Sequence, residues 1–123
     1  MNLLHILIIN KHVGSYLVIS RDEQILNLLG LAMRAGKLVL GSDSTLTAIR
    51  GNKVQMAFFP SDGGQSQRKK FADKSNFYNV TLIQDYTKTQ LTDAIGVNRS
   101  IFAIADRGFS RKIQQLILEK ERN

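Results

Sequence analysis

Apolar residues along this chain switch between helical spacing and short continuous runs. After Ser20 and Glu23, which have the spacing of a helix capping box, apolar residues recur every three or four positions from Ile25 to Met33. Gly36 then stands where such a helix would end, because glycine readily adopts the left-handed conformation of the residue after a helix. The pattern predicts a helix from residue 21 to 35.

The rest of the chain predicts four strands separated by further helices. The strand-like runs alternate little, which is typical of strands covered on both faces, and they occupy 38–40, 54–59, 80–83 and 101–105. Helical spacing fills the segments between and after them, at 41–50, 66–77, 87–95 and from Ser110 to about 118. This order predicts an α/β fold, a three-layer α/β/α sandwich with a mixed four-stranded sheet.

The first residues do not fit this pattern. We interpret residues 1–20 as an N-terminal extension and residues 21–123 as one domain. Leu3–Ile9 and Tyr16–Ile19 are apolar, but each run is shorter than the ~20 residues that span a bilayer. No basic segment precedes them, so we expect neither a signal peptide nor a membrane partner. An added strand, or a hairpin that turns near Gly14, is the alternative.

Composition narrows the classes of function. The chain has 17 Lys and Arg against 10 Asp and Glu, which gives a net charge of +7. Such a surplus favours an anionic partner, above all nucleic acid. Cysteine is absent, which excludes disulfides, thiolate nucleophiles and Cys-ligated metals, and suits a cytoplasmic protein. The two histidines, His5 and His12, lie near the N-terminus, so a histidine triad within the domain is excluded.

Three aspartates raise the alternative of a magnesium-dependent enzyme. Asp62, Asp85 and Asp106 each follow a predicted strand, where ligands gather in open α/β sheets. Aspartate is also favoured in turns and at helix N-caps, and no nucleophile, base or phosphate loop accompanies these three. We therefore expect no enzyme, no metal, no cofactor and no small-molecule substrate.

The helix that begins at Gly41 is the better candidate for a site. A helix N-terminus carries free N–H donors and partial positive charge, which suit phosphates. Its first turns add polar side chains able to reach bases, and cations lie close by in sequence: Ser42, Asp43, Ser44, Thr47, Lys37, Arg34 and Arg50. A surface loop at 96–100 precedes the last strand, and we expect it beside this helix with Val97, Asn98 and Arg99. The helix at 66–77 presents a basic face that would attract phosphates without sequence preference, with Arg68, Lys69, Lys70 and Lys74.

Several blocks together resemble the kink-turn RNA-binding ribosomal-protein superfamily, of the archaeal and eukaryotic L-seven-Ae and L-thirty-e type. The blocks are LNLLGLAMRAGK at 26–37, Gly41, AIR at 48–50, Asp62, Lys69-Lys70, YNV at 78–80 and AIADRGF at 103–109. The chain looks closest to the bacterial YlxQ-like branch, and the resemblance covers about residues 22–118. It implies an α/β/α sandwich that binds structured RNA, with ribosomal RNA or the ribosome as the expected partner.

In that superfamily, RNA contacts the start of the second helix and the loop before the last strand, which here are Gly41–Thr47 and Gly96–Ser100. The best-studied members carry an Asn-Glu pair and a later Lys in the helix, which meet the sheared G·A pairs of the kink. Here Asp43, Ser44 and Thr47 stand at those positions. Two hypotheses follow: a noncatalytic protein that recognises structured, kink-turn-like RNA, or a protein-interaction module on the same fold that has lost this recognition.

Overall fold

Helices and strands alternate along the chain, as the sequence predicts. The computed structural model describes residues 19–122, so the interpretations of residues 1–18 concern a segment outside the described residues. The elements are α2 (Arg21–Arg34), β1 (Leu38–Leu40), α3 (Ser42–Arg50), β2 (Met56–Phe58), α4 (Gln65–Phe77), β3 (Thr81–Ile83), α5 (Lys88–Ile95), β4 (Phe102–Ile104) and α6 (Arg107–Arg122). No helix within residues 19–122 has both the length and the apolar character needed to cross a membrane.

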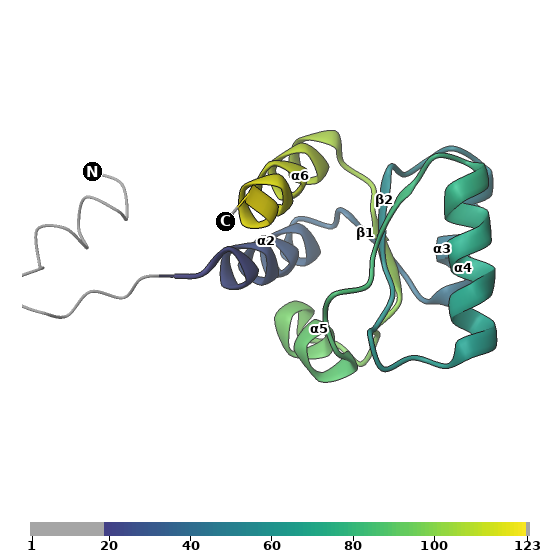
Figure 1. Ribbon diagram of the computed structural model, residues 1–123, viewed down its shortest axis with the longest axis horizontal. Coiled ribbons are helices and arrows are strands. Elements are labelled where there is room, and N and C mark those ends of the chain that lie inside the picture. Colours follow the sequence, from purple (N-terminus) through teal and green to yellow (C-terminus); the bar gives the residue numbers. More distant parts are fainter. Residues whose placement is uncertain (1–18, 123) are drawn as a thin grey trace, which may run out of the picture.

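The four strands form one mixed sheet in the order β1-β4-β2-β3. β4 runs antiparallel to both of its neighbours, whereas β2 and β3 are parallel. Helices α3 and α4 cover one face, and α2, α5 and α6 cover the other, as Figure 1 shows. The predicted three-layer α/β/α sandwich with a mixed four-stranded sheet is confirmed.

The two central strands divide the core into two halves. Met56 and Phe58 of β2 and Phe102 of β4 point to the face covered by α2, α5 and α6, and the Phe58 and Phe102 rings stack at 5.3 Å. Ala57 and Ala103, the residues between them, point to the face covered by α3 and α4. Successive residues of a strand alternate between faces, so each central strand contributes to both halves.

Local capping signals set most helix ends. Ser20 Oγ accepts a hydrogen bond from the Glu23 N–H at 3.1 Å, and the Glu23 carboxylate accepts one from the Ser20 N–H at 3.2 Å. This reciprocal pair is the predicted capping box. Gly36 and Gly96 have φ values of +71° and +78°, and both follow the end of a helix, Gly36 as predicted above.

The predicted start of the last helix is wrong. The helix begins at Arg107, three residues earlier than Ser110, because Asp106 Oδ2 accepts a hydrogen bond from the Phe109 N–H at 2.8 Å and caps the first turn. Ser110 is buried within α6. Three of the strands are shorter than predicted, since Val54, Phe59 and other apolar residues beside them are buried in the core without pairing as strand.

Candidate nucleic-acid interface

The direction of β4 decides which loops meet. The last residue of β1, Leu40, pairs with the first residue of β4, Phe102, and Phe58 at the end of β2 pairs with the same phenylalanine. The segments that follow β1, β2 and β3 therefore gather at one end of the sheet together with the loop that precedes β4. We call this the Gly41 end; it comprises residues 41, 59–64, 84–87 and 96–101.

At this end, the start of α3 lies against the loop before β4. The Gly41 N–H donates a hydrogen bond to the Ile101 carbonyl at 2.9 Å. Arg99 Nε lies 3.8 Å from the position that a Cβ on Gly41 would take. The structure thus brings together the two segments that the sequence analysis placed side by side.

The first turn of α3 offers backbone donors and polar side chains to solvent. Gly41 is the N-cap and has no side chain to cap the helix, so the N–H groups of Ser42, Asp43 and Ser44 have no hydrogen-bond partner within residues 19–122. Asp43, Ser44 and Thr47 are exposed, and Ser42 is half-buried. This turn can accept an anionic or carbonyl-bearing ligand at its backbone.

The loop before β4 contributes one cation and one amide. Asn98 and Arg99 are exposed, and the Arg99 guanidinium donates to the Asn98 carbonyl at 3.1 Å. Val97 is half-buried and packs against the core beneath α2 and α5. Arg99 is therefore the residue of this loop best placed to contact a phosphate beside α3.

Two of the three cations near Gly41 in sequence lie at the other end of the sheet. The Lys37 carbonyl accepts a hydrogen bond from the Ala105 N–H at 2.8 Å, which places Lys37 at the opposite end of the sheet. Arg50 lies at the far end of α3, nine residues long. The Arg34 side chain lies in the groove between α2 and α5, beside Gly30 and Ala94. Lys37 and Arg50 are therefore separate from the Gly41–Arg99 contact, whereas Arg34 lies beside the last turn of α5.

The basic face of α4 is only partly free for a ligand. Lys69 and Lys70 are exposed, and Lys69 Nζ pairs with Asp73 at 3.0 Å. Arg68, which the sequence analysis placed outward, instead donates to the Gln84 side chain and the Ser61 carbonyl, each at 2.8 Å. Its guanidinium also lies over the Phe59 ring, 5.2 Å from the centroid. Arg68 therefore holds the turn after β2 in place.

The magnesium alternative is contradicted by the topology. Asp62 and Asp85 lie at the Gly41 end, but Asp106 follows the antiparallel β4 and lies at the other end of the sheet. Asp62 Oδ1 accepts a hydrogen bond from the Lys88 N–H at 2.8 Å and caps α5, and Asp85 pairs with Lys120 at 3.3 Å. Residues 19–122 contain no group of three or more side chains arranged to hold a metal.

Asp22, Tyr86 and Lys120 form a polar network with shifted pKa values, which the sequence analysis did not predict. Lys120 Nζ lies 2.8 Å from Asp22 Oδ1, which also accepts a hydrogen bond from the Tyr86 hydroxyl at 2.8 Å. The hydrogen bond from Lys120, assisted by that from Tyr86, lowers the pKa of the Asp22 carboxyl. The same contact with Asp22 raises the pKa of Lys120, and burial followed by the bond to Asp22 raises that of Tyr86. These groups join α2, α6 and the start of α5.

Comparison with known proteins gives a consistent set of matches. The model of the ribosomal protein L7Ae/L30e/S12e/Gadd45 family matches residues 23–114. The RNA-binding protein YlxQ of Enterococcus faecium is 39% identical over 95 residues, which are 77% of this chain and 92% of that protein. The RNA-binding protein YlxQ of Bacillus subtilis is 34% identical over 91 residues, covering 73% of this chain and 91% of the relative.

Solved structures show the same fold. A Bacillus halodurans protein of unknown function is 35% identical, with a TM-score of 0.72, over 76% of this chain and 95% of its own. The Giardia lamblia 15.5kD RNA binding protein has a TM-score of 0.68 over 83% of this chain and 88% of its own. At 13% sequence identity, the second similarity concerns the fold alone.

Proposed function

Because the chain belongs to the ribosomal protein L7Ae/L30e/S12e/Gadd45 family, we propose that it binds structured, kink-turn-like RNA and works in the cytoplasm in association with the ribosome. The two relatives of similar length are named RNA-binding proteins, and the net charge of +7 suits such a partner. The family also bears out the prediction that the protein is not an enzyme.

The contact between Gly41 and the loop before β4 carries this proposal. The free N–H groups of Ser42, Asp43 and Ser44 and the guanidinium of Arg99 converge from two segments that are distant in sequence. Backbone donors at a helix N-terminus bind phosphate or base oxygens, and arginine adds a charged contact to the backbone of the RNA. Irregular RNA, whose bases are splayed, presents such groups at close range.

A gel-shift titration against a kink-turn RNA and a straight duplex of equal length, at two salt concentrations, tests the proposal. We expect the wild type to bind the kink-turn RNA more tightly at both salt concentrations. Arg99→Gln should weaken this binding by about tenfold, since hydrogen bonds to charged groups contribute about 1.5–3 kcal/mol. Arg122→Gln removes the same charge at the exposed end of α6 and should leave the affinity unchanged.

The other outcomes separate the finer points of the proposal. Equal, salt-sensitive binding to kink and duplex would overturn kink-turn recognition and leave a basic surface that attracts any RNA. Binding to neither RNA would overturn kink-turn recognition and RNA binding in general.

A second candidate is a protein-interaction module on this fold. The exposed Asp43 favours it, because a carboxylate in the first turn of α3 repels phosphates. Partners that remain bound in a pull-down from ribonuclease-treated lysate, with no RNA binding in the titration, would select this candidate.

A further inference from the structure

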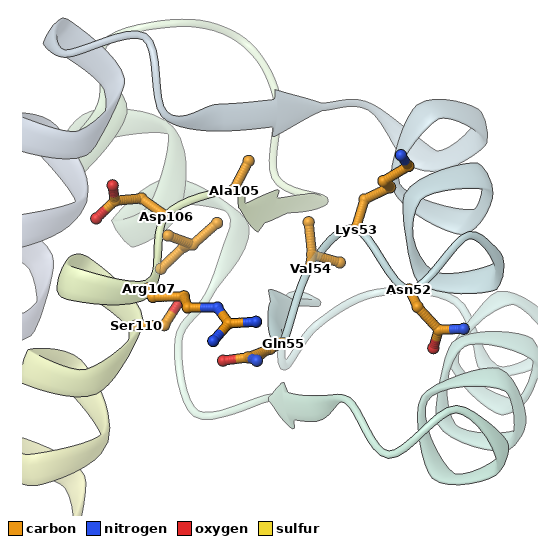
Figure 2. Close-up of a pocket in the computed structure, with 9 residues that line it drawn as sticks. Asn52, Lys53, Val54, Gln55, Ala105, Asp106, Arg107 and Ser110 are labelled. Carbon is orange, nitrogen blue, oxygen red and sulfur yellow. The ribbon is translucent and has the colours of Figure 1, made fainter.

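A pocket lies at the end of the sheet opposite Gly41. Residues 52–55, residues 104–107 and Ser110 line this space of about 210 Å³, shown in Figure 2. We call this part of the molecule the Lys53 end; it comprises residues 37, 51–55, 78–80 and 105–110. Figure 2 shows the guanidinium of Arg107 pointing toward Gln55, while the Asp106 carboxylate points away from the pocket.

One buried hydroxyl that lines this pocket is not used by the fold. The hydroxyl of Ser110, a residue only 6% exposed, lines the pocket and makes no hydrogen bond to another group of residues 19–122. The Asp106 carboxylate is occupied as the cap of α6, where it accepts from the Phe109 N–H at 2.8 Å. The pocket thus presents cations and neutral polar groups, with its carboxylate turned elsewhere.

Positive charge gathers around the Lys53 end. Helices α3 and α4 end there and α6 begins there, and together with the connecting loops they carry Lys37, Arg50, Lys53, Lys74, Arg107, Arg111 and Lys112. The ion pairs within residues 19–122 use other cations, namely Arg21, Lys69 and Lys120. None of the basic groups of the Lys53 end therefore forms an ion pair within residues 19–122.

The Gly41 end is closer to neutral, with Arg68, Lys88, Arg99 and Lys120 as its nearby cations. Its cations are accompanied by carboxylates at and near the loops, which include Asp43, Asp62, Asp85 and Asp93. The surplus of positive charge in this chain is thus concentrated away from the contact between Gly41 and Arg99.

An exposed aromatic ring accompanies the cations. Phe77, in the last turn of α4, is 76% exposed, the highest value among the large apolar side chains of residues 19–122. Its ring lies edge-on to Tyr78, with the ring centroids 4.8 Å apart. The Thr81 N–H donates to the Gln55 carbonyl at 2.9 Å, so the segment after Phe77 adjoins the pocket. Single-stranded bases stack on aromatic rings presented beside positive charge.

We propose that the Lys53 end is a second RNA-contacting surface, in which Lys53, Arg107 and their neighbouring cations bind phosphates and Phe77 stacks on a base. The inference rests on the proposed function and adds a separate surface to it. Helix α4 runs from one end to the other, and its 13 residues at ~1.5 Å per residue put the two ends on the order of 20 Å apart, so one folded RNA can contact both. The Gly41 end supplies local recognition, and the Lys53 end supplies most of the electrostatic attraction.

Salt-dependent binding to the same kink-turn RNA tests this surface. In Lys53→Gln/Arg107→Gln we expect the affinity at low salt to fall tenfold or more. The slope of log affinity against log salt should shrink by about 0.7–0.9 for each lost phosphate contact. Phe77→Ala should lower the affinity about fivefold or more with an unchanged slope, because stacking involves no counterion release.

Arg122→Gln is the matched control, because it removes an arginine from the opposite end of the same helix, α6. Thermal unfolding of each variant establishes that the fold is retained. Wild-type affinity and slope in Lys53→Gln/Arg107→Gln, with intact RNA binding by the wild type, would overturn the second surface and leave the proposed function standing. No RNA binding by the wild type would overturn both.

Discussion

Gly41 holds a backbone conformation that side-chain-bearing residues rarely adopt. Its φ of +94° and ψ of 159° turn the chain from β1 into α3 and aim the first N–H groups of the helix at solvent. The position of a Cβ there would meet only Arg99 Nε at 3.8 Å, so the requirement for glycine comes from the dihedral angles and not from crowding. A variant at Gly41 thus tests the fold as well as the site.

We predict that Gly41→Ala lowers the free energy of unfolding by about 1–3 kcal/mol, the usual cost of a strained backbone conformation. Gly64→Ala is the control, since Gly64 is also a helix N-cap but has φ −70° and open space around its Cβ position. Urea unfolding monitored by circular dichroism measures both. Equal midpoints for the two variants would contradict the argument.

At the scale of elements, α2 and α5 approach each other closely at a glycine. A Cβ on Gly30 would lie 2.8 Å from the Ala94 carbonyl oxygen, a backbone atom that cannot move aside without shifting α5. Glycine within a helix normally lowers helix stability by about 1 kcal/mol relative to alanine. At position 30 this cost is accepted because only glycine lets α2 and α5 pack so closely.

This contact predicts that replacing Gly30 destabilises the fold, whereas helix propensity alone would predict that it stabilises the fold. We expect Gly30→Ala to be destabilising by about 1–3 kcal/mol, because overpacking outweighs the gain in propensity. Asn27→Ala, on an exposed position of the same helix, should be neutral or slightly stabilising. Thermal unfolding compares the two, and a higher midpoint for Gly30→Ala would refute the packing argument.

The elements themselves could largely be predicted from the sequence, because their signals are local. The capping residues Ser20 and Glu23 and the helix-ending glycines Gly36 and Gly96 lie within a few positions of the structure they determine. The start of α6 was predicted wrongly, since Ser110 and Asp106 are both capable caps and only packing, which buries Ser110, distinguishes them.

The composition of the candidate site depended on strand direction, which no local pattern reveals. The contact between Gly41 and the loop before β4 was foreseen from the expected order of the strands. The positions of Lys37 and Asp106 were not, because β4 inserts antiparallel between β1 and β2 and reverses which loops share an end of the sheet.

At the scale of the whole molecule, one polar network joins segments far apart in the chain. Asp22 at the start of α2 contacts Tyr86 and Lys120, and Arg21 pairs with Glu119 at 3.0 Å, so the first and last described helices are held together. Because the pKa of Asp22 is lowered in the folded state, the stability that this network contributes depends on pH. A carboxyl whose pKa is lower in the folded state stabilises the fold above its unfolded pKa of ~3.9, and this contribution is lost as the pH falls through the folded value.

We predict that Asp22→Asn is less stable than the wild type at pH 7 and that the difference narrows as the pH falls below about 4. Asp93→Asn, at an exposed aspartate without an ion pair within residues 19–122, is the control and should stay close to the wild type. Urea unfolding at a series of pH values measures the effect. A stability difference between Asp22→Asn and wild type that stays constant from pH 7 to pH 3 would exclude a contribution from the Asp22 pKa.

Lys120 has the opposite pH dependence. Its pKa is raised in the folded state, so the ion pair stabilises the fold below the unfolded pKa of ~10.4, and this contribution is lost as the pH rises through the folded value.

The strand order also has a consequence for how the protein folds while it is being translated. β1 has a single neighbour in the sheet, β4, which is the last strand to be synthesised. While the chain is being translated, β2 and β3 can pair, but the apolar residues Leu38–Leu40 have no partner strand until Phe102–Ile104 has left the exit tunnel. The sheet therefore closes in one late step, and a nascent chain stalled before Phe102 exposes an unpaired strand to chaperones and to other chains.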